Sequence, residues 1–196
     1  MPVMPSLVAP AISVGALAMS DQPVLPVEGD ALLRPWTLDD APAVMEAFQD
    51  PAIQRWHVCT ADSVEEARDW IAAWQCGWRE ETGGHWAVVD AGGDTLLGRM
   101  SLKSFDLADG TADVAYWMVP SARGNGVCPR AVRTLARWAL GPGGFHRLEL
   151  EHSTANRASC RVAVKAGFEE EGVRRGAALH ADGWHDMHVH ARVRQG

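Results

Sequence analysis

The stretch Val119-Pro-Ser-Ala-Arg-Gly-Asn-Gly-Val-Cys-Pro-Arg-Ala-Val-Arg-Thr-Leu-Ala-Arg-Trp-Ala-Leu140 predicts the centre of the fold. It reads as a strand end, a glycine-rich turn and a helix. An alternating, β-rich run over residues 113–119 leads into it, and Pro120 ends that strand because proline has no N–H for the ladder. In the helix, Val132, Leu135, Ala136 and Ala139 follow the spacing of a buried face.

The turn of this stretch predicts an anion-binding site. Gly124 and Gly126 let successive backbone N–H groups converge without obstruction by a Cβ atom. Pro129 suits the first turn of the following helix, where its missing donor costs nothing. Converging N–H groups at a helix N-terminus favour a phosphate.

Known phosphate motifs narrow the choice of ligand. Neither the dinucleotide fingerprint nor the Walker loop is present. The spacing Arg123, Gly126, Cys128 (R-x-x-G-x-small) resembles the pyrophosphate loop of the GNAT superfamily of acyl-CoA-dependent N-acyltransferases. A purely structural turn between strand and helix is the alternative interpretation of the same residues.

A second motif strengthens the resemblance. The run Asn156-Arg-Ala-Ser-Cys-Arg-Val-Ala-Val-Lys-Ala-Gly-Phe168 fits N-x-x-S-x-x-V-x-x-K-x-G-F, which is similar to the second signature of the RimJ/RimL-like branch. Residues 33–41 (L-R-P-W-T-L-D-D-A) resemble the opening of that branch, and residues 171–186 resemble its C-terminal E-G, R, D-G, D pattern. Two motifs in the right order, separated by one strand, indicate the family.

The order of predicted elements is strand, helices, three strands, helix, strand, helix and two strands over residues 31–193, which is an α+β layout. The resemblance implies the GNAT fold: a mixed, mostly antiparallel central sheet flanked by helices, with strands splayed at the acetyl-CoA site. We expect one acetyltransferase domain over residues 30–196. Residues 1–29 are expected to be a disordered tail and linker; the alternative for residues 1–18 is an upstream start codon, with Met19 as the usual start. A secretory signal is disfavoured because no Lys or Arg precedes Arg34.

Composition restricts the compartment and the partners. A net charge of −7 argues against nucleic-acid and anionic-membrane binding. The four cysteines form no C-x-x-C pair, which suits a reducing cytoplasm, and no run is long enough to span a membrane. We therefore expect a cytoplasmic protein, with a homodimer as one possible assembly.

The resemblance implies acetyl-CoA as cosubstrate, no metal, and direct transfer to an amine in a ternary complex. The backbone N–H near Val119 is the expected donor to the thioester carbonyl. The cofactor-binding residues that the resemblance implies are Met118, Val119, Arg123, Gly124, Asn125, Gly126, Val127, Cys128, Asn156, Arg161 and Lys165.

Catalytic candidates come from both the resemblance and the chemistry. Many relatives carry a tyrosine acid where this chain has Ala163, and Ser159 matches the serine suggested as the acid in the RimJ/RimL-like branch. Capping of the helix after Asn156 is the alternative role of Ser159. The amine must lose a proton, and we expect Asp113 first and His152 second as the base.

Other residues near these motifs have weaker predicted roles. Further candidate bases are Glu149, Glu151 and His180. The Cys128 thiol at a helix start invites a lowered pKa and a covalent role, but a small buried filler is favoured.

The acceptor is predicted to contact aromatic residues after the first strand. Trp70, Trp74 and Trp78 recur at the spacing of one helix face, which is more typical of core than of a site. Substrate contacts are expected at Trp56, His57, Trp78 and Tyr116. The acceptor class, a protein N-terminus or a small-molecule amine, stays open.

Histidines near the C-terminus invite a metal interpretation. They are His180, His185, His188 and His190, together with Asp182 and Asp186. Hairpin histidines are common, and the resemblance implies no metal, so none is expected. The remaining alternatives for the whole chain are a non-catalytic acyl-CoA-binding module and an acyltransferase with a different acyl or aminoacyl donor.

Overall fold

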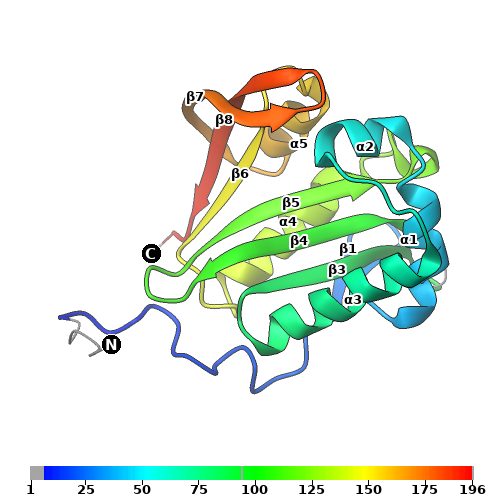
Figure 1. The fold of residues 1–196 in the computed structure, drawn as a ribbon. Helices are drawn as coiled ribbons and strands as arrows, with labels where there is room; N and C mark the ends of the chain where they lie inside the picture. The colour runs from blue at the N-terminus through cyan, green and yellow to red at the C-terminus, as the bar shows by residue number, and fades with distance from the viewer. Residues whose placement is uncertain (1–6, 94, 196) are drawn as a thin grey trace, which may run out of the picture.

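The computed structural model describes residues 7–93 and 95–195. Within them, eight strands form one sheet in the order β1-β2-β3-β4-β5-β6-β8-β7 (Figure 1). Every neighbouring pair is antiparallel except β5 and β6, which confirms the mixed, mostly antiparallel sheet. The strands are β1 Leu25–Val27, β2 Ala31–Pro35, β3 Gly83–Asp90, β4 Leu96–Asp106, β5 Thr111–Met118, β6 Arg147–Ser153, β7 Glu169–His180 and β8 Gly183–Val193.

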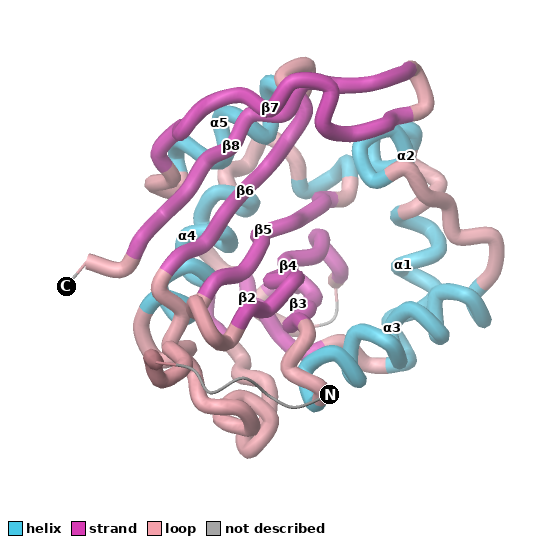
Figure 2. The backbone as a smooth tube through the Cα atoms, turned by 60° about the vertical axis from the view of Figure 1, so that its left-hand side comes forward, coloured by secondary structure: helices cyan, strands magenta, loops and turns pink. Residues whose placement is uncertain are grey.

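Helices cover both faces of the sheet (Figures 1 and 2). One group is α1 Ala41–Ala47, α2 Pro51–His57 and α3 Val64–Arg79; the other is α4 Val127–Leu140 and α5 Arg157–Lys165. Short 3₁₀ turns lie at Leu38–Asp40 and Pro120–Ala122. Side-chain caps begin three of the helices: Asp50 for α2, Ser63 for α3 and Asn156 for α5.

Two hydrophobic clusters hold the layers together. The predicted inward face of α4 is confirmed, since Val132, Leu135, Ala136 and Ala139 are fully buried against the sheet. On the opposite face, aromatic rings of α1, α3 and the sheet pack edge to face around Phe48, including Trp117. Such pairs add about 0.5–1.5 kcal/mol each beyond their buried area.

The two parallel strands separate soon after they begin. β5 pairs with β6 only at residues 111–113 against 147–149, and then the strands diverge (Figure 1). Residues 114–118 of β5 therefore leave an edge of about 16 Å unpaired with β6, at ~3.3 Å per residue. This is the predicted splay, and it opens the middle of the sheet between α2 and α5.

The N-terminal segment differs from the predicted disordered tail. Ile12 and Leu17 are buried in the main core, and β1 pairs with β2. The Glu81 carboxylate accepts the backbone N–H groups of Gly15, Leu17 and Ala18 at 2.6–3.2 Å. Residues 11–27 therefore pack on the domain. Their small apolar side chains let the segment follow the domain surface closely. Residues 1–6 lie outside the described part.

No helix in the described ranges combines the length and apolar character that a membrane span requires.

Candidate active site

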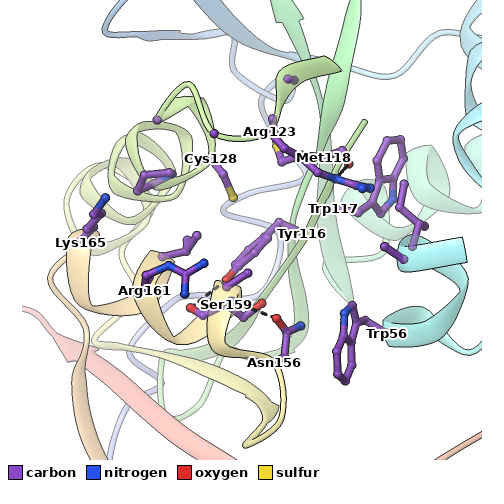
Figure 3. A pocket seen from close by; sticks show the side chains of 18 of the residues that line it. Trp56, Tyr116, Trp117, Met118, Arg123, Cys128, Asn156, Ser159, Arg161 and Lys165 are labelled. Atoms are coloured by element: carbon purple, nitrogen blue, oxygen red, sulfur yellow. Dashed lines mark hydrogen bonds between the residues drawn. The ribbon is translucent and has the colours of Figure 1, made fainter. Parts of the chain in front are cut away.

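Two cavities meet where β5 and β6 diverge. One, of about 440 Å³, lies between the loop after β5, α2 and α5 (Figure 3). The other, of about 470 Å³, lies between β5, β6, α2 and the β7–β8 hairpin. Five residues line both: Trp56, His57, Tyr116, Asn156 and Ser159. The arrangement gives two ligands access to a shared wall from opposite sides.

The glycine loop forms one end of the first cavity. Gly124 and Gly126 have φ of +82° and +72°, which favours glycine at both positions. A Cβ atom on Gly124 would meet no atom within 4 Å, so the loop surface is open at that point. α4 begins at Val127, directly after Gly126. This left-handed turn before a helix start fits the predicted phosphate cradle.

Arg123 lines the first cavity, but its guanidinium already has partners. It donates to the Met118 carbonyl at 3.0 Å and pairs with the Asp50 carboxylate at 2.8 Å. The same carboxylate caps α2 through the N–H groups of Ala52 and Ile53. The hydrogen bond from Arg123 holds the pKa of Asp50 below its usual value. Arg123 therefore joins the loop, β5 and α2.

Two cations remain for an anionic ligand. Arg161 and Lys165 lie on α5, line the first cavity and are exposed (Figure 3). Neither forms an ion pair within the described ranges. Because they are one turn apart on the helix, they present charge along one side of the cavity.

The peptide groups of β5 alternate between the two edges of the strand, so only some of them face the gap between β5 and β6. Val119 donates its N–H to the Leu97 carbonyl of the neighbouring segment, so it is not the donor that the sequence predicts. Strand alternation places the Tyr116 and Met118 peptide groups on the opposite edge. Their carbonyls accept hydrogen bonds from His57 and Arg123 on that side. The Met118 N–H is thus the donor that the strand turns toward the gap.

Most of the predicted cofactor residues line the first cavity: Met118, Arg123, Gly124, Gly126, Cys128, Asn156, Arg161 and Lys165. Three do not. Val119 is bonded to β4 through Leu97, Val127 is buried in the core, and Asn125 gives its carbonyl to Arg130 at 3.2 Å.

Ser159 and Tyr116 meet at the shared wall (Figure 3). The Tyr116 hydroxyl donates to the Ser159 carbonyl at 3.4 Å, and burial raises the pKa of this phenol. The Asn156 carboxamide caps α5 by accepting the Ser159 N–H at 3.1 Å. The Ser159 hydroxyl has no hydrogen-bond partner in residues 7–93 and 95–195, so the capping role belongs to Asn156. Tyr116, which was predicted to contact the acceptor, lines the first cavity as well as the second.

Cys128 directs its sulfur into the first cavity (Figure 3). Burial raises the pKa of this thiol to about 12, instead of lowering it as the helix-start position suggested. A thiol that stays protonated at neutral pH is a poor nucleophile. The structure thus favours the small filler role.

The candidate bases separate into two groups. Asp113, Glu149, Glu151 and His180 line the second cavity. Arg147 holds Glu149 at 2.8 Å and Arg174 holds Glu151 at 2.6 Å. The Asp113 carboxylate has no hydrogen bond or ion pair among the described residues.

His152 also lines the second cavity, but both of its ring nitrogens already have partners. Its Nδ1 donates to the Ser153 carbonyl at 2.8 Å, and its Nε2 lies 3.2 Å from His190 Nε2. Burial lowers its pKa. Alternation along β6 places the Glu149 and Glu151 side chains on the opposite face from the His152 ring, which packs against His190.

Only some of the predicted acceptor contacts lie at the site. Trp56 and His57 lie on α2 at the shared wall. His57 donates through Nε2 to the Tyr116 carbonyl at 3.1 Å, and burial lowers its pKa to about 4, so it is neutral at pH 7. Trp78 is wrong as a contact, because it is buried against Trp86 and Trp138 on the far side of the sheet.

Sequence reasoning missed Asp50, which attaches α2 to the cofactor loop, and Ile53, which lines the first cavity. The local signal was present, since Asp50-Pro51 is a helix-start pattern. Its pairing with Arg123 is a contact across 73 positions that no local pattern encodes.

A glycine-rich helix start and a polar cavity that meet at a splayed pair of strands suit a group-transfer enzyme. Residues 30–169 match the family model described as "Acetyltransferase (GNAT) domain". The chain belongs to this family and is an N-acetyltransferase.

Named relatives agree with this family. The chain is 24% identical over 164 residues to the uncharacterized N-acetyltransferase YoaA of Bacillus subtilis (strain 168), covering 83% of this chain and 93% of the relative. It is 28% identical to the ribosomal-protein-serine acetyltransferase of Escherichia coli (strain K12) over 51% of this chain and 56% of that one. A solved structure of the ribosomal α-N-protein acetyltransferase RimL with coenzyme A superposes with a TM-score of 0.78 at 20% identity, over 87% of this chain and 98% of that one.

Proposed function

We propose that the protein transfers an acetyl group from acetyl-CoA directly to a primary amine, with both substrates bound at once. The observation that carries this proposal is the pair of cavities that share Ser159, Tyr116 and His57 as a common wall. A donor on one side and an amine on the other would meet at that wall without a covalent enzyme intermediate. The raised pKa of Cys128 agrees with direct transfer.

The first cavity suits coenzyme A by its chemistry. Its glycine loop offers backbone donors for a pyrophosphate, and Arg161 and Lys165 offer charge. When bound, acetyl-CoA supplies the activated thioester. The Met118 N–H is our candidate donor to the thioester oxygen, and the loss of one such donor typically costs roughly 10²–10³ in rate.

Ser159 is our candidate acid for the departing thiolate. Its hydroxyl lies at the shared wall and is free of competing hydrogen bonds in the described ranges. Tyr116 fixes the same turn of α5 through the Ser159 carbonyl. This pairing lets the serine hydroxyl rotate while its backbone stays in place.

Asp113 is our candidate for receiving the amine proton, directly or through water. It lines the second cavity on the side where β5 and β6 still pair. Because Glu149 and Glu151 are neutralised by arginines, Asp113 is the carboxylate left to attract an ammonium group. A cationic amine would therefore approach from this cavity.

The acceptor class that we favour is a protein N-terminus, with small amines as the alternative. The second cavity offers both signs of charge along its walls, Asp113 for the amine and Lys103 and Arg174 for carbonyl or carboxylate oxygens further along the acceptor. The named ribosomal-protein relative supports the same class. The free cysteines and acidic charge suit the cytoplasm, where such N-termini emerge.

The test is a thiol-release assay with acetyl-CoA and two matched panels, short peptides with free N-termini and small amines. The expected result is turnover with peptides, with acetylation of the α-amine located by mass spectrometry. Turnover with small amines alone would show that the acceptor is a small amine and not a protein N-terminus. Saturable acetyl-CoA binding without turnover on either panel would favour a non-catalytic acyl-CoA-binding module. Turnover only with longer acyl-CoA donors would show that the transferred group is a longer acyl chain and not acetyl.

A further inference from the structure

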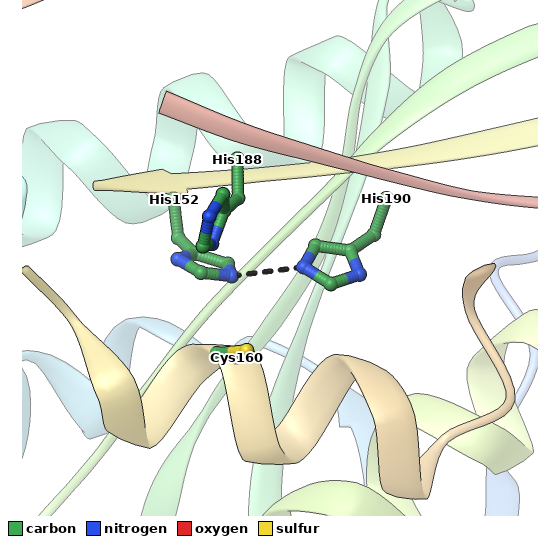
Figure 4. A group of neighbouring side chains, drawn as sticks. All are labelled: His152, Cys160, His188 and His190. Atoms are coloured by element: carbon green, nitrogen blue, oxygen red, sulfur yellow. Dashed lines mark hydrogen bonds between the residues drawn. The ribbon is translucent and has the colours of Figure 1, made fainter. Parts of the chain in front are cut away.

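Four potential metal ligands converge beside α5, next to the second cavity, which His152 also lines (Figure 4). They are His152 on β6, His188 and His190 on β8, and Cys160 on α5. One ring nitrogen from each histidine and the cysteine sulfur all lie within 4.8 Å of one another. His152 and His190 are buried, and the other two are partly buried.

Strand register creates this convergence. His152 pairs directly with His188 across β6 and β8, and His190 lies two residues further along the same face of β8. α5 covers that face: Ala163 is fully buried, and Cys160 lies one turn earlier on the same side of the helix. Three elements far apart in sequence thus deliver four ligands to one point.

The imidazoles are oriented as metal ligands are. His152 donates from Nδ1 to the Ser153 carbonyl at 2.8 Å, which leaves the Nε2 lone pair directed at the cluster. His188 places Nε2 at 4.0 Å from the Glu170 carboxylate. A backbone carbonyl in the position of the Ser153 carbonyl commonly fixes the tautomer of a metal-bound histidine.

Two buried nitrogens in the cluster are orphaned. His188 Nδ1 and His190 Nδ1 have no hydrogen-bond partner in residues 7–93 and 95–195. Buried polar atoms are normally satisfied, and an unsatisfied one calls for an explanation such as an ion. His188 Nδ1 is the nitrogen left over when Nε2 faces Glu170, so a cation in the cluster would satisfy it.

We propose that His152, Cys160, His188 and His190 form a tetrahedral site for a borderline-soft divalent transition metal of the Zn²⁺ class. The His152 Nε2–His190 Nε2 separation is 3.2 Å. A tetrahedron with Zn–N of ~2.0–2.1 Å has an edge of about 3.3 Å, so this pair already fits. Three imidazoles and a thiolate without a carboxylate ligand disfavour Mg²⁺ and Ca²⁺.

The site has a structural role in this proposal. Four protein ligands close the coordination sphere, which is typical of structural zinc. The metal would tie α5 to β6 and β8, and Cys160 directly follows Ser159 on α5. The hairpin set that the sequence suggested is different: His185 bonds Ser153 and Asp182, and only His188 and His190 of that set enter the cluster.

The first experiment titrates the metal-depleted full chain with Co²⁺ and measures its absorption. The expected result is one Co²⁺ per chain, with tetrahedral d–d bands and a thiolate-to-cobalt charge-transfer band, followed by displacement with Zn²⁺. Cys160→Ser should abolish the charge-transfer band, while Cys76→Ser, at an exposed cysteine, should leave it intact. His190→Gln should weaken affinity by about 10²-fold or more, with the exposed His146→Gln as its control.

A second measurement avoids any dependence on variant folding. In the wild-type chain, Zn²⁺ should protect Cys160 from alkylation while Cys59 and Cys76 still react, as read by peptide mass spectrometry. Zn²⁺ should also raise the Tm of the wild type. Absence of Co²⁺ binding to the folded wild type, or equal alkylation of Cys160 with and without Zn²⁺, would overturn the proposal. Both readouts are independent of acetyl transfer.

Discussion

The Ser159 hydroxyl keeps its hydrogen-bonding capacity, unlike several charged side chains of the site. Arg123, Glu149 and Glu151 are each held by an oppositely charged partner. The Ser159 hydroxyl is free within the described ranges because Asn156 takes over the capping of α5. A proton donor must be able to reorient as charge develops on the leaving group, and this residue can.

The replacement Ser159→Ala should lower kcat by about 10²-fold, the lower end of the usual range for a general acid. KM for acetyl-CoA and the Tm should change little, because the hydroxyl caps nothing. Ser121→Ala, which removes an exposed hydroxyl from the same region, is the matched control. A fall in Tm with normal kcat would assign Ser159 a structural role instead.

At the scale of elements, α2 and the cofactor loop are joined by one ion pair. Asp50 caps α2 and binds Arg123, and Arg123 also binds the last carbonyl of β5 at Met118. The pair is partly exposed, so its energy is small, at about 0.2–1 kcal/mol. Its effect is to hold the loop beside the first cavity.

Asp50→Asn tests this pair because asparagine keeps a good N-cap while it removes the charge. We expect KM for acetyl-CoA to rise about two- to five-fold, which corresponds to the energy of such a pair. Arg123→Glu should raise it further, because a carboxylate then faces the phosphates. Arg55→Gln breaks an exposed pair with Asp182 away from the loop and serves as control. Unchanged KM in both Asp50→Asn and Arg123→Glu would exclude this loop as the phosphate site.

At the scale of the whole molecule, the N-terminal segment is part of the packed domain. Burial opposes ionisation of Glu81, but three backbone N–H donors outweigh it and hold the pKa of this carboxyl below its usual value. A lowered carboxyl pKa stabilises the folded state above the unfolded value, and that contribution is lost as pH falls through the folded value.

Glu81→Ala should therefore release residues 15–18 without unfolding the sheet. The measurement is hydrogen exchange at neutral pH, where Gly15, Leu17 and Ala18 amides should exchange much faster in the variant than in the wild type. Amides of β4 should be unaffected in both. Equal protection of the segment in the two proteins would contradict the role assigned to Glu81.

Two partly buried histidines give the molecule a pH dependence. Burial lowers the pKa of His57 to about 4 and that of His85 to about 3. The unfolded chain takes up these protons near pH 6.5, before the folded chain does, so stability falls as pH drops below about 6.5 and continues to fall until the folded values are reached.

The variant His85→Gln should reduce this acid loss. Between pH 6.5 and 4.5 the Tm of the wild type should fall, and the fall should be smaller in the variant because one proton uptake is gone. His146→Gln, at an exposed histidine, should follow the wild type. Parallel curves for wild type and His85→Gln would show that His85 does not titrate differently in the two states.

The sequence by itself determined the elements whose causes are local. Gly124 and Gly126 predicted the turn and have a left-handed backbone, and the spacing of residues 132–139 predicted the buried face of α4. Each depends on neighbours within about one helical turn. The family motifs lie in the same two short stretches, so the class of enzyme was within reach of the sequence.

Only the tertiary structure decided which side chains meet. The register of β6 on β8 set the His152 ring against His190, and the packing of α3 buried Trp78 while α2 left Trp56 at the site. Asp50 met Arg123 only because α2 folds over the end of β5. Periodicity gives the face of an element, whereas its partner depends on sheet order and loop paths that contacts across the whole chain determine.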